Sequence, residues 1–183
     1  MPPLQGDKVR LRAPAPADYP TLYSWFSDPQ VVAPYDRFVS ESYDGFVRSM
    51  SVTEDDPTSL VPRFVVERAD SPGPIGVVGH FTPHPVLETV EVWYIMGDRA
   101  TRGRGYGREA VRLLTDHLFR TTSVDRVGAT CDVENLPSSR LAEGLGFRRE
   151  GTLKGAFYHH GRWHDVYLYG VTRAEWLRPG APA

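Results

Sequence analysis

The chain has 183 residues, of which 40% are hydrophobic, and its formal net charge at pH 7 is −2. This length predicts one domain with a sizeable core, and the small negative charge excludes a general attraction to nucleic acid or anionic membranes. No apolar run approaches the roughly 18 residues of a membrane-spanning helix, and the N-terminus shows no apolar signal-peptide segment. We therefore expect a cytoplasmic protein without a membrane partner.

The predicted elements of the first half follow from apolar periodicity and from turn residues. In chain order they are a strand at 8–12, a helix at 17–26, a loop at 29–41, a helix at 42–50 capped by Ser42, an acidic loop at 53–62, and strands at 63–68 and 75–81 around a turn at 70–74.

The second half alternates strands and helices. It predicts a strand at 89–96, a helix at 105–120, a strand at 126–131, a helix at 137–145, and strands near 147–154 and 163–172. This order is typical of an α/β (α+β) domain, in which a mixed sheet carries helices on its faces. The single cysteine, Cys131, ends a predicted strand and is interpreted as a small core residue rather than a nucleophile.

Glycine and arginine alternate between the strand 89–96 and the helix 105–120, in the string Arg102-Gly103-Arg104-Gly105-Tyr106-Gly107. The glycines let backbone N–H groups approach a ligand, and the following helix N-terminus favours a phosphate. The string is neither a nucleotide P-loop nor the G-x-G-x-x-G dinucleotide fingerprint. It predicts an anion cradle of the form Arg-x-x-Gly-x-Gly.

A second motif follows the strand 126–131 and runs from Glu134-Asn135 through Ser138 and Arg140 to Gly146-Phe147. Asn135 is predicted to cap a helix, and Gly146 lies where that helix would end. The two motifs together resemble those of the GNAT N-acetyltransferase superfamily. The segments 25–29 and 161–166 resemble its branch of ribosomal-protein N-terminal (alanine/serine) acetyltransferases, and the resemblance covers about residues 8–177.

The resemblance implies a single acyl-CoA N-acyltransferase domain over residues 1–183. The expected sheet is mixed and mostly antiparallel, with the central parallel strands 89–96 and 126–131 splayed apart to admit the pantetheine arm. The implied activity is direct transfer of an acetyl group from acetyl-CoA to a primary amine, without an acyl-enzyme and without a metal. The absence of a Cys–His or Ser–His–Asp pattern at a recognisable spacing is consistent with direct transfer.

The resemblance also implies the residues that hold the donor. The strand end would bind the pantetheine amides, an N–H of Ile95 or Met96 would face the thioester carbonyl, and the glycine turn would hold the pyrophosphate. The expected cofactor-binding residues are Tyr94, Ile95, Met96, Arg102, Gly103, Arg104, Gly105, Tyr106, Gly107, Arg108, Asn135 and Ser138.

Two residues are the candidates for proton transfer. Glu91 is the first choice of general base, because the resemblance implies a glutamate on this strand, and its alternative role is that of an outward-facing strand residue in an ion pair. The second choices are His80, His84, His159 and His160. The family's usual tyrosine acid is replaced by Ala142. The resemblance to the ribosomal-protein branch implies a serine three residues after the asparagine, which makes Ser138 the candidate acid, with helix capping as its alternative role.

Aromatic and polar residues in the variable segments are the candidates for acceptor binding: Tyr35, Phe38, Tyr158, His160, Trp163 and Asp165. Core packing remains an alternative for about half of the aromatics. The acceptor is expected to be a small-molecule amine or a protein N-terminus. Two alternatives stay open. One is an amide-forming transferase that uses an aminoacyl-tRNA donor, which is the one case with a nucleic-acid partner. The other is a non-catalytic acyl-CoA-binding domain. A homodimer is also possible.

Overall fold

Eight strands form one sheet within the described residues of the computed structural model, which are 3–32, 42–51, 64–83, 89–159 and 161–178, and their order is β1-β2-β3-β4-β5-β6-β8-β7. The strands are β1 Leu4–Gln5, β2 Val9–Arg12, β3 Phe64–Arg68, β4 Ser71–Phe81, β5 Thr89–Ile95, β6 Arg126–Asp132, β7 Arg148–His159 and β8 Arg162–Thr172. The helices are η1 Pro16–Asp18, α1 Tyr19–Ser27, α2 Pro29–Val32, α3 Tyr43–Ser51, η2 Arg99–Thr101, α4 Tyr106–Thr121, α5 Leu136–Gly144 and α6 Arg173–Trp176.

Neighbouring strands pair antiparallel, except that β5 and β6 pair in parallel. The predicted fold class is therefore confirmed: the sheet is mixed, mostly antiparallel, with a central parallel pair. A parallel pair needs a crossover connection, which α4 provides between β5 and β6. None of the described helices is long and apolar enough to cross a membrane.

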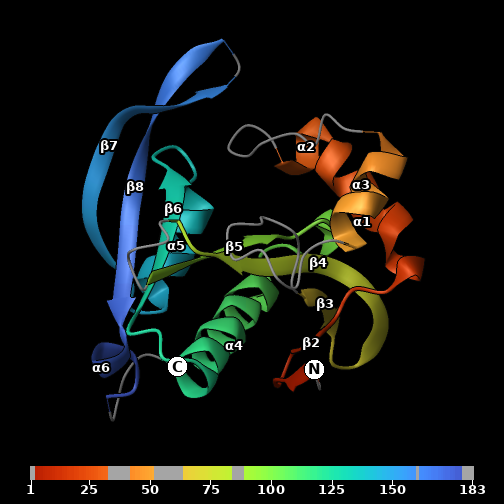
Figure 1. Ribbon diagram of the computed structural model, residues 1–183, viewed down its shortest axis with the longest axis horizontal. Coiled ribbons are helices and arrows are strands. Elements are labelled where there is room, and N and C mark those ends of the chain that lie inside the picture. Colours follow the sequence, from red (N-terminus) through yellow and green to blue (C-terminus); the bar gives the residue numbers. More distant parts are fainter. Residues whose placement is uncertain (1–2, 33–41, 52–63, 84–88, 160, 179–183) are drawn as a thin grey trace.

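Helices cover both faces of the sheet. One face packs against the buried stripe of α4, including Ala110, Leu114 and Leu118, and forms the larger core. The other face of β3, β4 and β5 packs against α1, α2 and α3 through a second core that contains Leu22, Phe26 and other residues. Figure 1 shows α4 on one side of β4 and β5 and the three N-terminal helices on the opposite side.

The structure corrects three predicted boundaries. Strand β4 begins at Ser71, so most of the predicted turn at 70–74 belongs to the strand, because Ser71 and Pro74 pair with Arg68 and Glu67 of β3. Residues 29–32 form the short helix α2 rather than a loop, because the Asp28 side chain accepts a hydrogen bond from the Gln30 N–H and Val32 is buried in the second core. Strand β7 extends to His159, well beyond the predicted end, because pairing with β8 resumes at Phe157 after an irregularity. The rest of the predicted loop 29–41 and the predicted loop 53–62 lie outside the described residues.

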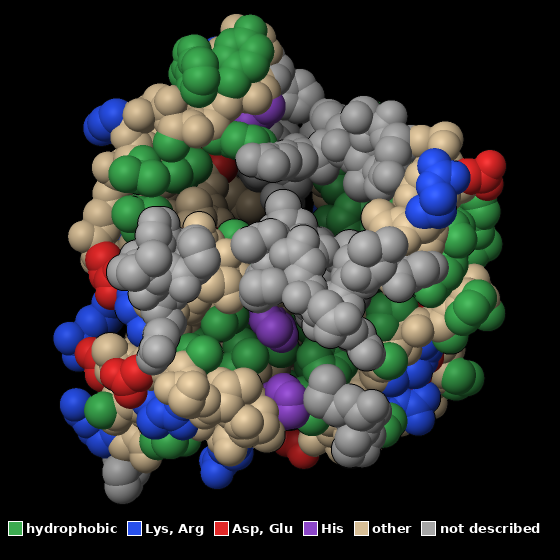
Figure 2. Space-filling model, viewed as in Figure 1, with side chains coloured by type: hydrophobic (Ala, Val, Ile, Leu, Met, Phe, Trp, Pro, Cys, Tyr) green, Lys and Arg blue, Asp and Glu red, His purple; other side chains and the backbone are tan. Residues whose placement is uncertain are grey.

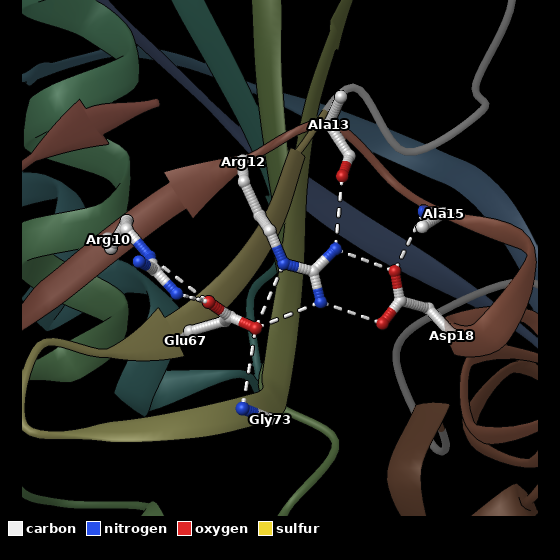
Figure 3. Close-up of polar contacts among 7 residues, drawn as sticks. All are labelled: Arg10, Arg12, Ala13, Ala15, Asp18, Glu67 and Gly73. Atoms are coloured by element: carbon white, nitrogen blue, oxygen red, sulfur yellow. Dashed lines mark hydrogen bonds and ion pairs between the residues drawn. The ribbon is translucent and has the colours of Figure 1, made fainter. Parts of the chain in front are cut away.

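Ion pairs and hydrogen bonds between charged residues connect η1 to the end of β2 in the sheet (Figure 3). The Arg12 guanidinium donates to both Asp18 carboxylate oxygens at 2.7 Å, and its Nε donates to Glu67 at 2.9 Å. Hydrogen bonds from Arg12 lower the pKa of the Asp18 carboxyl despite its burial. This ion pair therefore stabilises the fold above the ordinary carboxyl pKa, and its contribution is lost as the pH falls through the lowered value.

Arg12→Met should lower the free energy of unfolding by about 3 kcal/mol, because it leaves the buried carboxylates of Asp18 and Glu67 without their shared cation. Urea denaturation measures the change. Arg68→Met is the matched control, since Arg68 pairs with an exposed partner, Asp70, and should cost less than about 1 kcal/mol. Equal losses in the two variants would contradict the assigned role of the Arg12 network.

Candidate functional site

A cleft opens in the sheet where β5 and β6 separate. The two strands pair at only three positions, the last of which joins Glu91 to Gly128. Beyond that position β5 continues to Ile95 and β6 to Asp132, and a cavity of about 580 Å³ lies between their ends. Figure 2 shows a hollow in the molecular surface between the β7–β8 hairpin and the N-terminal helices. Here the edge of β5 lines a cavity instead of pairing with another strand.

The glycine–arginine turn forms one end of this cavity. Gly103 and Gly105 have positive φ angles of 76° and 84°, and Gly105 is the N-cap of α4. Residues with a side chain rarely adopt a backbone conformation with positive φ, so the turn depends on glycine. The first turn of α4 directs backbone N–H groups, including those of Tyr106 and Gly107, out of the helix end. The predicted anion cradle is thus a helix N-terminus that borders the cavity.

Two of the arginines predicted to bind the cofactor, Arg102 and Arg108, donate hydrogen bonds to backbone carbonyls. Arg102 donates to the Met96 carbonyl at 3.0 and 2.9 Å and so ties the turn to the end of β5. Arg108 donates to the Gly144 carbonyl at 2.7 Å and ties α4 to α5. Both residues line the cavity.

Lys8 brings a further positive charge to the turn, and the sequence analysis missed it. Its ammonium donates to the Arg104 carbonyl at 3.4 Å. The approach depends on Glu109, whose carboxylate accepts the backbone N–H groups of Asp7, Lys8 and Val9 at 2.8–3.0 Å. Lys8 lies about a hundred residues before the turn in the chain, and no local sequence pattern indicates this contact.

Asn135 and Ser138 lie at the start of α5, on the cavity wall. The predicted cap is confirmed: the Asn135 side chain accepts the Ser138 N–H at 3.2 Å. The Ser138 hydroxyl lies within hydrogen-bonding reach of the Cys131 thiol, as does the Ser139 hydroxyl at 3.4 Å. Burial raises the pKa of the Cys131 thiol, which favours its neutral form and agrees with a packing role.

Glu91 lies beside the point where the strands separate, on the sheet face opposite α4. Its carboxylate accepts a hydrogen bond from the Thr130 hydroxyl at 3.1 Å. Burial raises the pKa of this carboxyl, and the Thr130 hydrogen bond and the Arg126 charge reduce the shift without cancelling it. The group therefore holds a proton more readily than an exposed glutamate, which suits a general base.

Among the histidines proposed as alternative bases, His80 lies on the α4 face, because side chains alternate along β4 and its neighbour Gly79 faces Trp93 on the opposite side. His159 lies near the end of β7 and its Nε2 contacts the Asp132 carboxylate at 3.2 Å. His84 and His160 lie outside the described residues.

Asp132 joins two histidines in a buried cluster that the sequence analysis did not single out. His164 Nδ1 and His159 Nε2 both approach Asp132 Oδ2, at 2.7 and 3.2 Å, and the two rings stack with centroids 3.6 Å apart. The donor atoms suit a divalent metal and lie within 4.8 Å of one another. However, ligands of one metal spread around it, so metal binding would require these stacked rings to separate. The observed geometry is that of a carboxylate hydrogen-bonded to two imidazoles.

Three of the predicted acceptor residues, Tyr158, Trp163 and Asp165, lie on the β7–β8 hairpin. Tyr158 and Trp163 are exposed and form an edge-to-face pair with ring centroids 5.3 Å apart. Asp165 accepts hydrogen bonds from Lys154 Nζ at 2.7 Å and from the Gly155 N–H at 2.9 Å, which stabilises the irregular part of β7. Tyr35, Phe38 and His160 lie outside the described residues.

Comparison with known proteins agrees with this geometry. Residues 8–148 match the family model of the acetyltransferase (GNAT) domain. The chain is 27% identical over 161 residues to the uncharacterized N-acetyltransferase YnaD of Bacillus subtilis, covering 87% of this chain and 90% of YnaD. It is 32% identical over 95 residues to the ribosomal-protein-serine acetyltransferase of Escherichia coli, covering 52% of each chain.

A similar fold occurs in the crystal structure of spermidine N-acetyltransferase from Vibrio cholerae in complex with CoA and spermine. The TM-score is 0.80 with 24% sequence identity, and the match covers 93% of this chain and 98% of that chain.

Gly105→Asp should weaken the binding of CoA about 100-fold, or nearly 3 kcal/mol, because it adds a carboxylate to the anion cradle. Isothermal titration calorimetry measures the affinity. Gly161→Asp is the matched control, since Gly161 has a similar φ of 78° and open space around it. Aspartate tolerates this conformation better than most residues, so both variants should fold. Unchanged affinity in folded Gly105→Asp protein would remove the turn from the binding site.

Proposed function

The chain belongs to the acetyltransferase (GNAT) family of acyl-CoA-dependent N-acyltransferases, and we propose that it transfers an acetyl group from acetyl-CoA directly to a primary amine. One observation carries this proposal: the edge of β5 that no longer pairs with β6 leads to a glycine cradle at the start of α4. A strand edge that leads along a cavity to a glycine turn at a helix N-terminus matches the pantetheine amides and the pyrophosphate of one extended donor.

The donor would lie along β5 as an added strand. The amides of the pantetheine arm would pair with backbone groups of Tyr94, Ile95 and Met96, as a peptide pairs with an exposed sheet edge. The Arg102 hydrogen bonds to the Met96 carbonyl support this role, because they fix the backbone at the strand end. An N–H of Ile95 or Met96 would then stabilise the oxyanion of the thioester carbonyl, a contribution of roughly 3 kcal/mol in other enzymes.

Glu91 would receive the proton of the amine. A primary amine with a pKa near 10 is only about one part in a thousand neutral at pH 7, so the reaction needs a proton acceptor. Glu91 lies beside the point where β5 and β6 separate, on the sheet face opposite α4. Burial raises the pKa of its carboxyl toward the working range of a general base. The donor would therefore enter from the α4 side and the acceptor from the other side.

Ser138 would protonate the departing thiolate. The position at which many family members carry a tyrosine acid is Ala142, which cannot donate a proton. Ser138 borders the same cavity, and the Asn135 cap engages its backbone N–H while its hydroxyl lies beside Cys131. Named relatives act on a ribosomal protein and on spermidine, so a protein amine and a small-molecule amine are both candidate acceptors.

Ser138→Ala should lower kcat about 10- to 100-fold with little change in the affinity for acetyl-CoA, since it removes the proposed acid but leaves the cradle intact. Steady-state assays of thiol release measure kcat. Ser139→Ala is the neighbouring control: it also removes a hydroxyl near Cys131 and should retain kcat within about twofold. A wild-type kcat for Ser138→Ala would eliminate this serine as the acid.

Glu91→Gln should remove the acidic limb of the pH profile of kcat/KM, because the neutral amide cannot accept the proton. The wild-type rate should fall as the pH decreases through the raised pKa of Glu91. Thr130→Val removes a hydrogen bond that lowers this pKa, so it should move the limb to higher pH. If the limb persists unchanged in Glu91→Gln, His159 becomes the leading candidate for the base.

A further inference from the structure

Lys8 places an ammonium group directly beside the glycine turn at the start of α4. Its Nζ donates to the Arg104 carbonyl at 3.4 Å. A Cβ added to Gly105, the N-cap residue of α4, would lie 3.3 Å from the same nitrogen. The ammonium therefore lies against the stretch of backbone that begins the anion cradle.

Both backbone groups of Lys8 are held in place. The Lys8 N–H donates to the Glu109 carboxylate at 2.8 Å, and the Lys8 carbonyl accepts the Ala69 N–H at 2.8 Å. Glu109 belongs to the first turn of α4 and also accepts two further N–H groups of the N-terminal segment. A Cβ at Gly6 would lie 3.0 Å from the Glu109 carboxyl group, so glycine there permits this close approach. Lys8 and the turn are thus fixed relative to one another.

The Lys8 ammonium retains hydrogen-bonding capacity for a ligand. An ammonium carries three N–H donors, and in the described part of the chain the Arg104 carbonyl is the one group that accepts from Lys8 Nζ. The residue is exposed. Arg102 and Arg108 differ, because their guanidinium groups donate to backbone carbonyls of neighbouring elements. Two donors of Lys8 therefore remain for a group with negative charge.

Lys8 lies outside the cavity that the pantetheine arm would occupy. Gly105 and Gly107 line that cavity, whereas Lys8 does not. An acetyl-CoA with its pantetheine in the cavity and its pyrophosphate at the first turn of α4 leaves its adenosine outside. The ribose of this adenosine carries both the pyrophosphate and the 3′-phosphate. A cation on the outer side of the turn is therefore suited to the 3′-phosphate.

We propose that Lys8 binds the 3′-phosphate of the CoA donor and makes the enzyme selective for CoA over dephospho-CoA, which lacks that phosphate. This inference rests on the proposed acetyl transfer and narrows its donor to free acyl-CoA. An acyl group on a protein-bound phosphopantetheine arm has no 3′-phosphate, so such a donor would not engage Lys8. Hydrogen bonds between an ammonium and a phosphate are charge-assisted and stronger than neutral ones.

The pyrophosphate is the alternative anion for Lys8, but the turn supplies other partners for it. Backbone N–H groups and the helix dipole favour an anion at the start of α4. Arg102 and Arg108 are the arginines of the turn region that line the cavity. The 3′-phosphate is the part of CoA for which the cavity lining offers none of these groups, because it lies beyond them.

Lys8→Met should weaken the binding of CoA about tenfold and leave that of dephospho-CoA within about twofold, as isothermal titration calorimetry measures. Lys8→Arg keeps the positive charge and should retain most of the preference for CoA. Both variants should fold, because the contacts that fix position 8 are made by its backbone. Lys154→Met is the matched control, since Lys154 is the chain's other lysine and pairs with Asp165 on the hairpin. It should change neither affinity.

Equal losses for CoA and dephospho-CoA in Lys8→Met would overturn the inference while leaving acetyl transfer intact, because Lys8 would then bind the pyrophosphate that both ligands share. An unchanged affinity for CoA would also overturn it. If the wild-type protein binds neither CoA nor acetyl-CoA, the proposed function itself fails, and this inference with it.

A spectroscopic measurement tests the contact without turnover. Reductive methylation with ¹³C-formaldehyde labels both lysines and keeps their charge, and Lys8→Met and Lys154→Met assign the two signals. CoA should shift the Lys8 signal, and dephospho-CoA should shift it much less. Equal shifts with the two ligands would contradict a contact with the 3′-phosphate.

Discussion

The parallel pairing of β5 and β6 stops at Glu91 and Gly128, and the rest of the site depends on this interruption. A strand edge in the middle of a sheet exposes backbone donors and acceptors that must be satisfied by another partner. Here the strands diverge around a cavity, so an extended ligand with amide groups can take the place of the missing pairing. The anion cradle is at the end of the same edge, because α4 starts where the chain leaves β5.

Several tertiary contacts position the elements around this interruption. Arg102 and Arg108 tie the turn to β5 and to α5, and Glu109 binds three backbone N–H groups of the N-terminal segment. The two cores support opposite faces of the sheet: α4 packs on the face proposed for the acyl donor, and α1–α3 pack on the face that carries Glu91. Metal chemistry is not needed for this account, and the stacked geometry of His159 and His164 favours a hydrogen-bonded cluster with Asp132.

Local sequence patterns predicted the order of elements and the Asn135 cap, because periodicity, capping residues and glycine turns are local signals, whereas the splayed pair was predicted from the family resemblance. The family resemblance rested on the same two motifs, and the match over residues 8–148 confirms it. Lys8, Trp93 and the Asp132 cluster were not predicted, since each depends on contacts between segments that are distant in the sequence. The approach of Lys8 requires Glu109, and the place of Trp93 requires glycine at position 79 of the neighbouring strand. The roles of Glu91 and Ser138 remain predictions, and no described contact favours an aminoacyl-tRNA donor.

The central claim is that the cavity between β5 and β6 binds an acetylated CoA. Isothermal titration of the wild-type protein with acetyl-CoA, with CoA as the control, tests it most directly. The account predicts micromolar or tighter binding of both ligands at one site per chain. A folded protein that binds neither ligand would contradict the account and would require another occupant for the unpaired edge of β5.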